Sequence, residues 1–410
     1  MLRVIWLGFF VIGLLFAVAR LLWSHDLNVF TALSEGLFSM AKTGFELGLG
    51  LVGIMSLWLG LLKVGEKAGM VEWLSRRIAP FFSVMFPSVP AGHPAQGSMM
   101  LNFAANMLGL DNAATPLGLK AMEELQRINP SEETASDAQI FFLLLNASGL
   151  TIVPISIMAY RAQMGAESPS DVFLPILFAT FVSTLTVMIL TAFRQRLPVF
   201  RLVFLIPFLL FLSLVFAGVW GLRGMASDAL NTWSSLVGNG FLCFLVVGIL
   251  VWGHQKKRDV FADFVEGAKE GFQLCLNVIP YLIAMLCAIA FFRASGAMEI
   301  LLDGIRFLVA VAGLSDAFVP AIPTMLLKPL SGAGSRAMML DAMKTLGPDS
   351  FAGRLACIVQ GSADTTFYIM TVYFGAVKIK NIRYALSYSL LGDLAGFFAA
   401  LFVAYLFFQV

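Results

Sequence analysis

Two kinds of apolar run alternate along this chain. Continuous runs, close to the roughly 17 to 25 residues that cross a bilayer, predict membrane spans at 4–22, 46–64, 171–193, 199–221, 237–253, 273–292 and 384–408. Shorter runs, each interrupted by Gly, Pro, Asn, Ser or Thr, lie at 69–86, 97–118, 138–160, 297–313, 317–333 and 350–376. Irregular backbone at membrane depth is tolerated only beside protein or a water-filled cavity. The pattern therefore predicts an all-α integral membrane protein whose broken or re-entrant helices line a cavity.

The polar interruptions occur twice. Residues 146–151, Asn-Ala-Ser-Gly-Leu-Thr, return at 360–365 as Gln-Gly-Ser-Ala-Asp-Thr. Residues 69–72, Gly-Met-Val-Glu, likewise return at 296–299 as Gly-Ala-Met-Glu. A duplicated apolar chain with a polar break at the same place in each copy is typical of secondary transporters. We therefore expect two homologous repeats.

The two copies divide the chain, and its basic residues orient it. Basic clusters at 194–201 and 256–258 flank a pair of spans that has no counterpart in either copy, and such clusters favour the cytoplasmic side. With a cytoplasmic amino terminus, the two copies have inverted topology. A cleaved signal peptide is the alternative for the first run. The predicted layout is a first span at 1–27, a first repeat at 28–196, a linker helical hairpin at 197–258 and a second repeat at 259–410.

Charged residues among Phe and Leu mark the start of each repeat, at 28–45 and 259–272. This mixture predicts amphipathic helices that lie at the membrane interface before each repeat enters the bilayer. A plain connecting helix without membrane contact is the alternative.

Composition supports the membrane assignment and excludes several function classes. Hydrophobic residues make up 59% of the chain and charged residues 13%, against about 25% charged in an ordinary soluble domain. We expect a multi-pass protein of the inner (cytoplasmic) membrane. The net charge of +2, without a stripe of Lys and Arg, predicts no nucleic-acid partner. The spacing of the three His and four Cys residues predicts neither a metal site nor a disulfide framework. With no Gly-Lys dipeptide there is no phosphate-binding loop of the ATPase type, and no cofactor is expected.

Polar residues in the interrupted runs of the first repeat are candidates for binding a solute. Gly109 and Pro116 bracket a polar stretch that contains Asp111, which favours a helix end, a short unwound stretch and a new helix start. Unwinding frees carbonyl groups for cations and exposes amide hydrogens for anions. The predicted binding residues of this repeat are Asn102, Asn106, Asp111, Asn112, Thr115, Asn146, Ser148 and Thr151.

The second repeat contributes a break of opposite charge. Residues 327–336 hold two glycines, two serines and a proline, together with Lys328 and Arg336. A cavity with Asp111 on one wall and Lys328 on the other suits a zwitterionic or hydrogen-bonding solute. Alternatively, both cations extend to a membrane surface and the glycines only let helices pack closely. The predicted binding residues of this repeat are Lys328, Ser331, Ser335, Gln360, Ser362, Thr365 and Thr366.

One acid stands out in the second repeat. A carboxylate within a run such as 355–376 costs several kcal/mol unless it is paired, protonated or solvated. We therefore predict Asp364 as the residue that couples transport to a proton or sodium ion. A structural ion pair with Lys328 or Arg354 is the alternative. Asp393 is a further acid within a span, near enough to the start of that span to be interfacial.

Long motifs in both halves resemble a known family. The first half, through ELGLGLVGIMSLWLGLLKVGEKAG, LNFAANMLGLDNAATPLGLKAMEELQ and LNASGLTIVP, resembles spore maturation protein A. The second half, through FVEGAKEGFQLCLNVIPYLIAML, KPLSGAGSRAM and QGSADTTFYIMTVYFGAVKIKNIRYAL, resembles spore maturation protein B. The chain thus resembles a natural fusion of two members of the nucleoside-recognition, or Gate, domain family. That family is also similar to the membrane parts of concentrative nucleoside transporters, so the resemblance implies a pore or carrier gate.

These observations predict a transporter or permease that moves a small polar solute or ion by alternating access, with possible coupling to a cation. Its expected partners are that solute, the lipid bilayer and, in one arrangement, further copies of itself. A membrane scaffold or regulator in envelope or spore maturation, which binds a partner protein and moves nothing, is the alternative. An enzyme is not expected and no catalytic residue is assigned, because the adjacent Glu123 and Glu124 point to different faces of a helix.

Overall fold

The chain folds almost entirely into helices. The computed structural model describes residues 2–90, 92–109, 111–152, 154–197, 213, 227–313 and 315–408. Within these residues the only extended pairing is one parallel bridge between Thr134 and Asn381. Among the described helices, those long and apolar enough to cross a membrane are α1 (Leu2–Ser24), α2 (Val29–Lys67), α8 (Phe173–Gln195), α11 (Val260–Ala294) and α17 (Ala385–Phe407). The prediction of an all-α integral membrane protein is therefore confirmed.

The order of the helices in the first half returns in the second. After α2 the chain forms α3 (Met70–Met85), α4 (Pro94–Met107), α5 (Asp111–Arg127), α6 (Asp137–Ala147), α7 (Ile155–Gln163) and α8. After α11 it forms α12 (Ala297–Val311), the short helix η1 (Val319–Ala321) continued by α13 (Ile322–Leu327), α14 (Gly332–Leu346), α15 (Phe351–Gly361), α16 (Thr366–Ala376) and α17. Helix α10 (Ser227–Gln255) precedes the second series.

The first turn of each series is built in the same way. Gly69 precedes α3 with φ 83°, and Gly296 precedes α12 with φ 85°. Only glycine adopts this left-handed conformation without steric cost, so the two matched Gly-x-x-Glu motifs encode one turn twice. The inverted relation of the two series remains a prediction.

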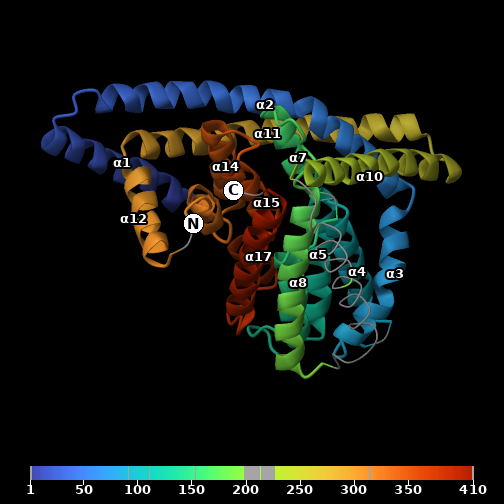
Figure 1. The fold of residues 1–410 in the computed structure, drawn as a ribbon. Coiled ribbons are helices and arrows are strands. Elements are labelled where there is room, and N and C mark those ends of the chain that lie inside the picture. The colour runs from blue at the N-terminus through green and yellow to red at the C-terminus, as the bar shows by residue number, and fades with distance from the viewer. Residues whose placement is uncertain are drawn as a thin grey trace.

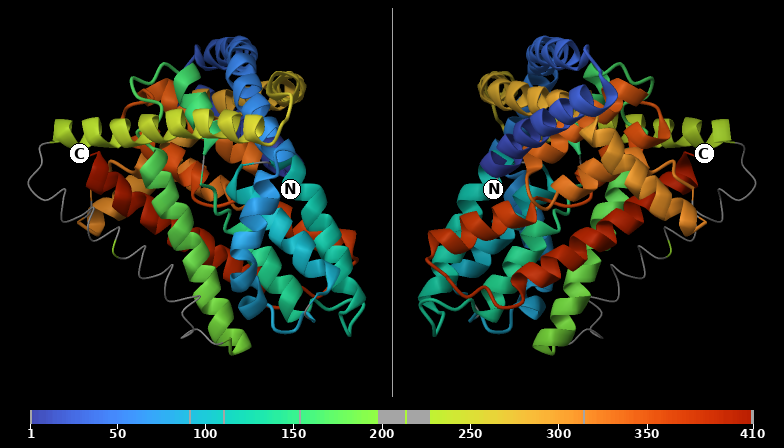
Figure 2. Two further views of the ribbon diagram at one scale, coloured as in Figure 1. Left: turned by 90° about the vertical axis from the view of Figure 1, so that its right-hand side faces the viewer. Right: turned by 90° about the vertical axis from the view of Figure 1, so that its left-hand side faces the viewer.

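The long helices α2 and α11 run side by side along one edge of the molecule, while α8 and α17 extend away from them (Figure 1). The turned views show the same arrangement, with α2 and α11 seen nearly end-on (Figure 2). The two helices approach closely because glycines, which have no side chain, lie at their contact. A Cβ atom at Gly267 would lie 2.4 Å from the Leu59 carbonyl oxygen, and one at Gly271 would lie 2.7 Å from the Met55 carbonyl oxygen.

The predicted interfacial helices at 28–45 and 259–272 are not separate elements. Each is the start of one continuous helix, α2 or α11, that also contains the predicted span. At about 1.5 Å per residue, α2 is roughly 60 Å long, twice the ~30 Å hydrocarbon thickness, so it must tilt or extend beyond the bilayer. Acids of the 259–272 stretch pair with the end of α2: Asp263 with Lys67 at 3.0 Å and Glu270 with Lys63 at 3.0 Å.

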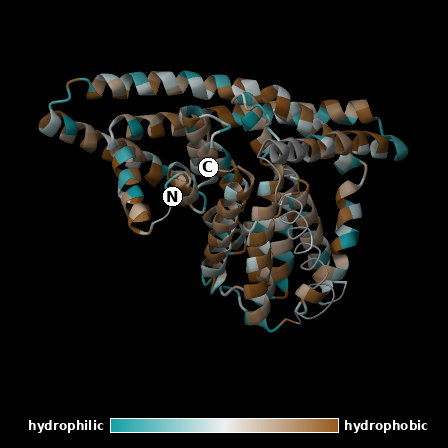
Figure 3. Ribbon diagram, viewed as in Figure 1, coloured by the Kyte–Doolittle hydropathy of each residue, from teal (hydrophilic) through white to brown (hydrophobic). Residues whose placement is uncertain are grey.

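Some of the runs that were predicted to be interrupted form two helices, and others form one. Helices α3 and α12 are unbroken, because the chain accommodates Pro80 inside α3 and turns sharply before each helix. The other interrupted runs are divided as predicted, between α4 and α5, α6 and α7, α13 and α14, and α15 and α16. The span predicted at 199–221 lies outside the described residues, apart from residue 213. Hydrophilic residues gather at the turns between helices, such as the one that joins α10 to α11 (Figure 3).

Candidate functional site

The break in each half ends its helix with the same bond. Helix α6 ends at Ser148, whose hydroxyl donates to the Leu145 carbonyl at 3.0 Å. Helix α15 ends at Ser362, whose hydroxyl donates to the Val359 carbonyl at 2.9 Å. A serine that bonds back to the preceding turn satisfies carbonyl groups that the end of a helix leaves free. The repeated serine therefore has a structural role in stopping each helix.

The two breaks touch each other at the centre of the molecule. The Asp364 amide donates to the Ala147 carbonyl at 2.9 Å, so the backbone of one break is bonded to the end of the other half's helix. Gly149 has φ 60°, and a Cβ atom there would lie 2.7 Å from the Asp364 nitrogen. No side chain fits between the two breaks.

Other helices hold each break from the side in a matched way. In the first half the Ile152 amide donates to the Met107 carbonyl at 2.8 Å, and in the second the Phe367 amide donates to the Pro329 carbonyl at 3.0 Å. These bonds join each break to the chain at the end of α4 or α13. Backbone that leaves a helix at membrane depth needs such partners, and here protein supplies them.

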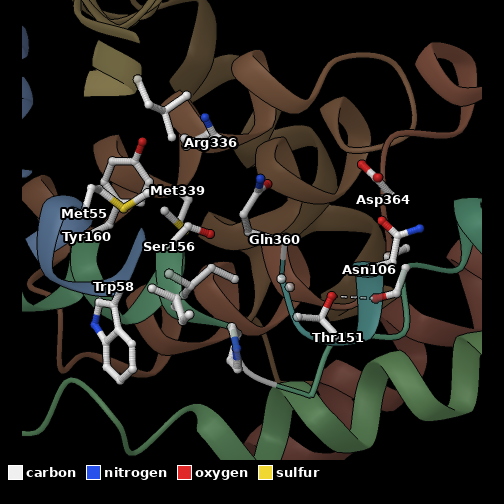
Figure 4. A pocket seen from close by; sticks show the side chains of 18 of the residues that line it. Met55, Trp58, Asn106, Thr151, Ser156, Tyr160, Arg336, Met339, Gln360 and Asp364 are labelled. Carbon is white, nitrogen blue, oxygen red and sulfur yellow. Dashed lines mark hydrogen bonds between the residues drawn. The ribbon is translucent and has the colours of Figure 1, made fainter. Parts of the chain in front are cut away.

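A pocket of about 200 Å³ opens beside the two breaks (Figure 4). It takes residues from α2, α7, α11 and α14 as well as from the breaks of both halves. Gln360 lies between a group containing Arg336 and Tyr160 and a group containing Asn106 and Asp364 (Figure 4). Six predicted site residues line it: Asn106, Asn146, Thr151, Lys328, Gln360 and Asp364.

Amide and ammonium groups in the pocket are held in place by bonds to one another. The Asn106 amide donates to the Asn146 side-chain oxygen at 2.8 Å. The Lys328 ammonium is 4% exposed and donates to the Gln360 carbonyl at 2.7 Å. The Gln360 side-chain oxygen in turn accepts from the Ser335 hydroxyl at 2.6 Å. The pocket wall is thus a preorganised polar surface, with matched Asn146 and Gln360 at its centre.

Asp364 is exposed and lines the pocket, and one of its carboxylate oxygens accepts from the Thr365 amide at 2.7 Å. It is not buried in an apolar run, because the helix stops before it at Gly361 and restarts only at Thr366. Among the described residues of the lining, the charged side chains are two cations, Lys328 and Arg336, and this one carboxylate.

The remaining predicted binding residues with described side chains do not line the pocket. Asn102 is fully buried and donates to the Ala114 carbonyl at 2.8 Å, which holds α4 against α5. Ser331 caps α14 by accepting from the Gly334 amide at 3.0 Å. The others that are not part of the lining are Thr115, Ser148, Ser335, Ser362, Thr365 and Thr366.

The unwound stretch predicted between Gly109 and Pro116 is shorter than expected. Helix α5 already begins at Asp111 and includes Pro116, so Asn112 and Thr115 are helical. The side chains of Asp111 and Asn112 lie outside the described residues. The predicted pairing of a negative wall at Asp111 with a positive wall at Lys328 therefore stays a prediction.

Sequence reasoning missed the apolar and aromatic part of the lining. Trp58 comes from the middle of α2 and Tyr160 from α7, and the Arg336 guanidinium lies 5.7 Å from the centre of the Tyr160 ring. Arg336 stood out in its motif, but it was not assigned to the site. Trp58 lies in an unbroken span, so only the crossing of α2 over the pocket brings it there.

Glu123 and Glu124 differ in exposure on α5. Glu123 is exposed, whereas Glu124 is 8% exposed on the other side of α5. The adjacent acids face different ways, as expected for neighbours on a helix.

Comparison with known proteins assigns the family. The model of the Gate family, described as nucleoside recognition, matches residues 49–198 and 275–380. The chain belongs to the Gate family. The two matched regions contain both helix breaks and most of the pocket lining.

Two relatives from Bacillus subtilis (strain 168) each resemble part of this Gate protein. Spore maturation protein A is 37% identical over 183 residues, which are 45% of this chain and 90% of that protein. Spore maturation protein B is 42% identical over 176 residues, which are 43% of this chain and 96% of that protein. Each relative is thus matched over nearly its whole length by less than half of this chain, consistent with a fusion of the two.

Proposed function

We propose that this Gate protein moves a small polar solute or ion across the inner (cytoplasmic) membrane by exposing the central pocket to each side in turn. The observation that carries the proposal is the contact between the two helix breaks, because it places one polar pocket between the two matched regions. Under this proposal the two regions are inverted repeats, and they move against each other around the bonded breaks.

The lining supports a solute that carries an acidic group together with hydrogen-bonding groups. Lys328 and Arg336 can bind a carboxylate or phosphate oxygen, as buried ammonium and guanidinium groups do. Asn106 and Gln360 add amide donors and acceptors. Trp58 and Tyr160 supply flat apolar surface for the rest of the molecule.

Asp364 is the proposed site of the coupling cation. It is the carboxylate among the described residues of the lining, and its own backbone amide makes the bond between the two breaks. A cation bound here therefore acts at the contact around which the two regions move. Replacing Asp364 by Asn keeps the size of the side chain and removes its negative charge.

The proposal is tested by the thermal stability of the purified protein with a panel of nucleosides, nucleobases, small carboxylates, amino acids and metal ions, with and without sodium. A ligand at about a thousand times its dissociation constant adds roughly 4 kcal/mol to the folded state. We expect one chemical class to raise Tm, and we expect its sodium or pH dependence to disappear in Asp364→Asn. Asp303→Asn on α12 is the matched control, because Asp303 is exposed and lies outside the pocket. Ion-dependent stabilisation that is undiminished in Asp364→Asn removes Asp364 from the coupling role.

A scaffold that binds a partner protein is the second candidate. The observation that favours it is that polar residues of the breaks bond to each other, as Asn106 does with Asn146. If no compound in the panel shifts Tm, the result supports this candidate over transport.

A further inference from the structure

Asp393 is a buried acid that the proposed transport site does not use. It lies in α17, a helix long and apolar enough to span the membrane, and is 2% exposed. Its Oδ2 atom accepts from the Thr366 hydroxyl at 2.7 Å. Its Oδ1 atom is buried and has no hydrogen-bond partner among the described residues. A carboxylate in this position is costly unless a proton or another group neutralises it.

Buried hydroxyl groups lie near this acid at the contact between α8 and α17. Ser389 lies one turn before Asp393 on the same face of α17, and its buried hydroxyl has no partner among the described residues either. Ser183 of α8 packs against α17 where glycine leaves room: a Cβ atom at Gly392 would lie 3.6 Å from the Ser183 hydroxyl oxygen. That hydroxyl is also buried and unpartnered in the described part of the chain. The site is polar, enclosed and incompletely bonded.

Two charged side chains affect the charge of Asp393 in opposite directions. The Lys328 ammonium favours its negative charge, and the Asp364 carboxylate opposes it. Thr366 of α16 contacts it directly through a hydroxyl, and Ser183 of α8 packs against the neighbouring Gly392. Hydroxyls stabilise a carboxylate less than a cation in direct contact does, which leaves a proton as the neutralising partner that the geometry can hold.

The side chains that contact the helix break from α8 and from α17 differ in their chemistry. In the first half, Thr180 of α8 lies against the break, with its hydroxyl 3.4 Å from the Gly149 carbonyl. In the second half, Asp393 of α17 contacts the break through Thr366. A threonine hydroxyl can donate and accept at any pH, whereas a carboxyl group donates only when it carries a proton. A change of protonation at Asp393 thus alters how α17 holds the start of α16.

We propose that Asp393 is a proton-binding site that controls the helix break of the second half. One proton adds to Oδ1, neutralises the carboxyl group and lets it donate to a neighbouring hydroxyl or carbonyl oxygen. Loss of the proton places a negative charge next to Thr366, two residues after Asp364 of the pocket. Only the use of this proton for coupling rests on the proposed function; the binding of the proton does not.

Infrared spectroscopy of the full-length protein in lipid, titrated with pH, tests the site directly. We expect a carboxyl C=O band that persists at neutral pH, where exposed acids are ionised, shifts in heavy water and is lost as the pH rises. The band should be missing in Asp393→Asn and retained in the matched variant Asp364→Asn. A band that is unchanged in Asp393→Asn, or the lack of any such band in the unaltered protein, overturns the proposal.

A second variant keeps the test valid if Asp393→Asn does not fold. Thr366→Val removes the hydroxyl that donates to Oδ2, so it should move the band to a different frequency without abolishing it. A band that stays in place in Thr366→Val contradicts the assignment to Asp393. The two proposals can fail separately: the band without any solute-dependent change in Tm overturns transport alone, whereas solute binding without the band overturns the proton site alone.

Discussion

Gly149 shows how closely the two halves meet at the scale of one residue. Its positive φ and the nearby Asp364 nitrogen leave no space for a side chain. The matched position in the second break is Ala363, so the demand for glycine is confined to the first half. The contact between the breaks therefore depends on a residue that polarity alone does not mark as important.

Gly149→Ala should destabilise the protein by about 2 kcal/mol or more, because the left-handed backbone costs roughly 1–2 kcal/mol for a residue with a Cβ atom and crowding adds to this. Unfolding in detergent, followed by heat or denaturant, measures the loss. Gly53→Ala in α2 is the control: nothing lies within 4 Å of a Cβ atom there, so we expect unchanged or slightly raised stability. Equal effects of the two substitutions would falsify the tight contact.

The sequence identified many residues of the site but not their separate roles. Asn146 and Gln360 were found by their repetition, and both line the pocket. Ser148 and Ser362 repeat just as clearly, yet their hydroxyls bond to the preceding turns. Repetition in sequence cannot separate the two roles, because a turn that is needed twice is encoded twice just as a binding group is.

At the scale of elements, a buried ionic cluster joins α7 to the start of α15. The Arg161 guanidinium is fully buried and lies 2.9 Å from both Asp171 and Asp349. Arg354 pairs with Asp171 at 2.7 Å. Two arginines and two aspartates thus balance each other across the two matched halves.

Arg161→Met should cost about 3–5 kcal/mol, because it leaves the buried Asp171 and the partly buried Asp349 with one cation. The free energy of unfolding in detergent measures this cost. Arg306→Met on α12 is the matched control: its pair with Asp303 is exposed, and such pairs contribute about 1 kcal/mol or less. A small loss for Arg161→Met, similar to that of the control, would mean that the cluster does not hold the halves together.

The sequence predicted where helices break better than where they continue. Gly, Pro and capping serines act locally, so the breaks that follow α4, α6, α13 and α15 could be predicted. Near residue 45, where α2 continues, Gly44 and Gly48 pack against Ile283 and Ile279 of α11, more than two hundred positions away. A window of local sequence does not contain that information.

The whole molecule is two series of helices that share one pocket. The family match includes part of each series, and each Bacillus relative matches less than half of the chain. Duplication stays a prediction from internal comparison of the sequence, and the similar order of helices in the two series agrees with it. The aromatic wall from Trp58 and Tyr160 could not be predicted from the sequence, because it depends on how α2 and α7 cross the breaks in space.

Cysteine accessibility of the pocket tests alternating access most directly, since it needs no knowledge of the solute. Ser156 lines the pocket and is close in size to cysteine, so Ser156→Cys can be placed in a chain whose four native cysteines are replaced. Ser295→Cys is the control, because Ser295 is fully buried away from the pocket. We predict that a membrane-impermeant thiol reagent labels Cys at 156 in vesicles of either orientation but does not label the control. Labelling at 156 from one side only, or from neither, contradicts the account.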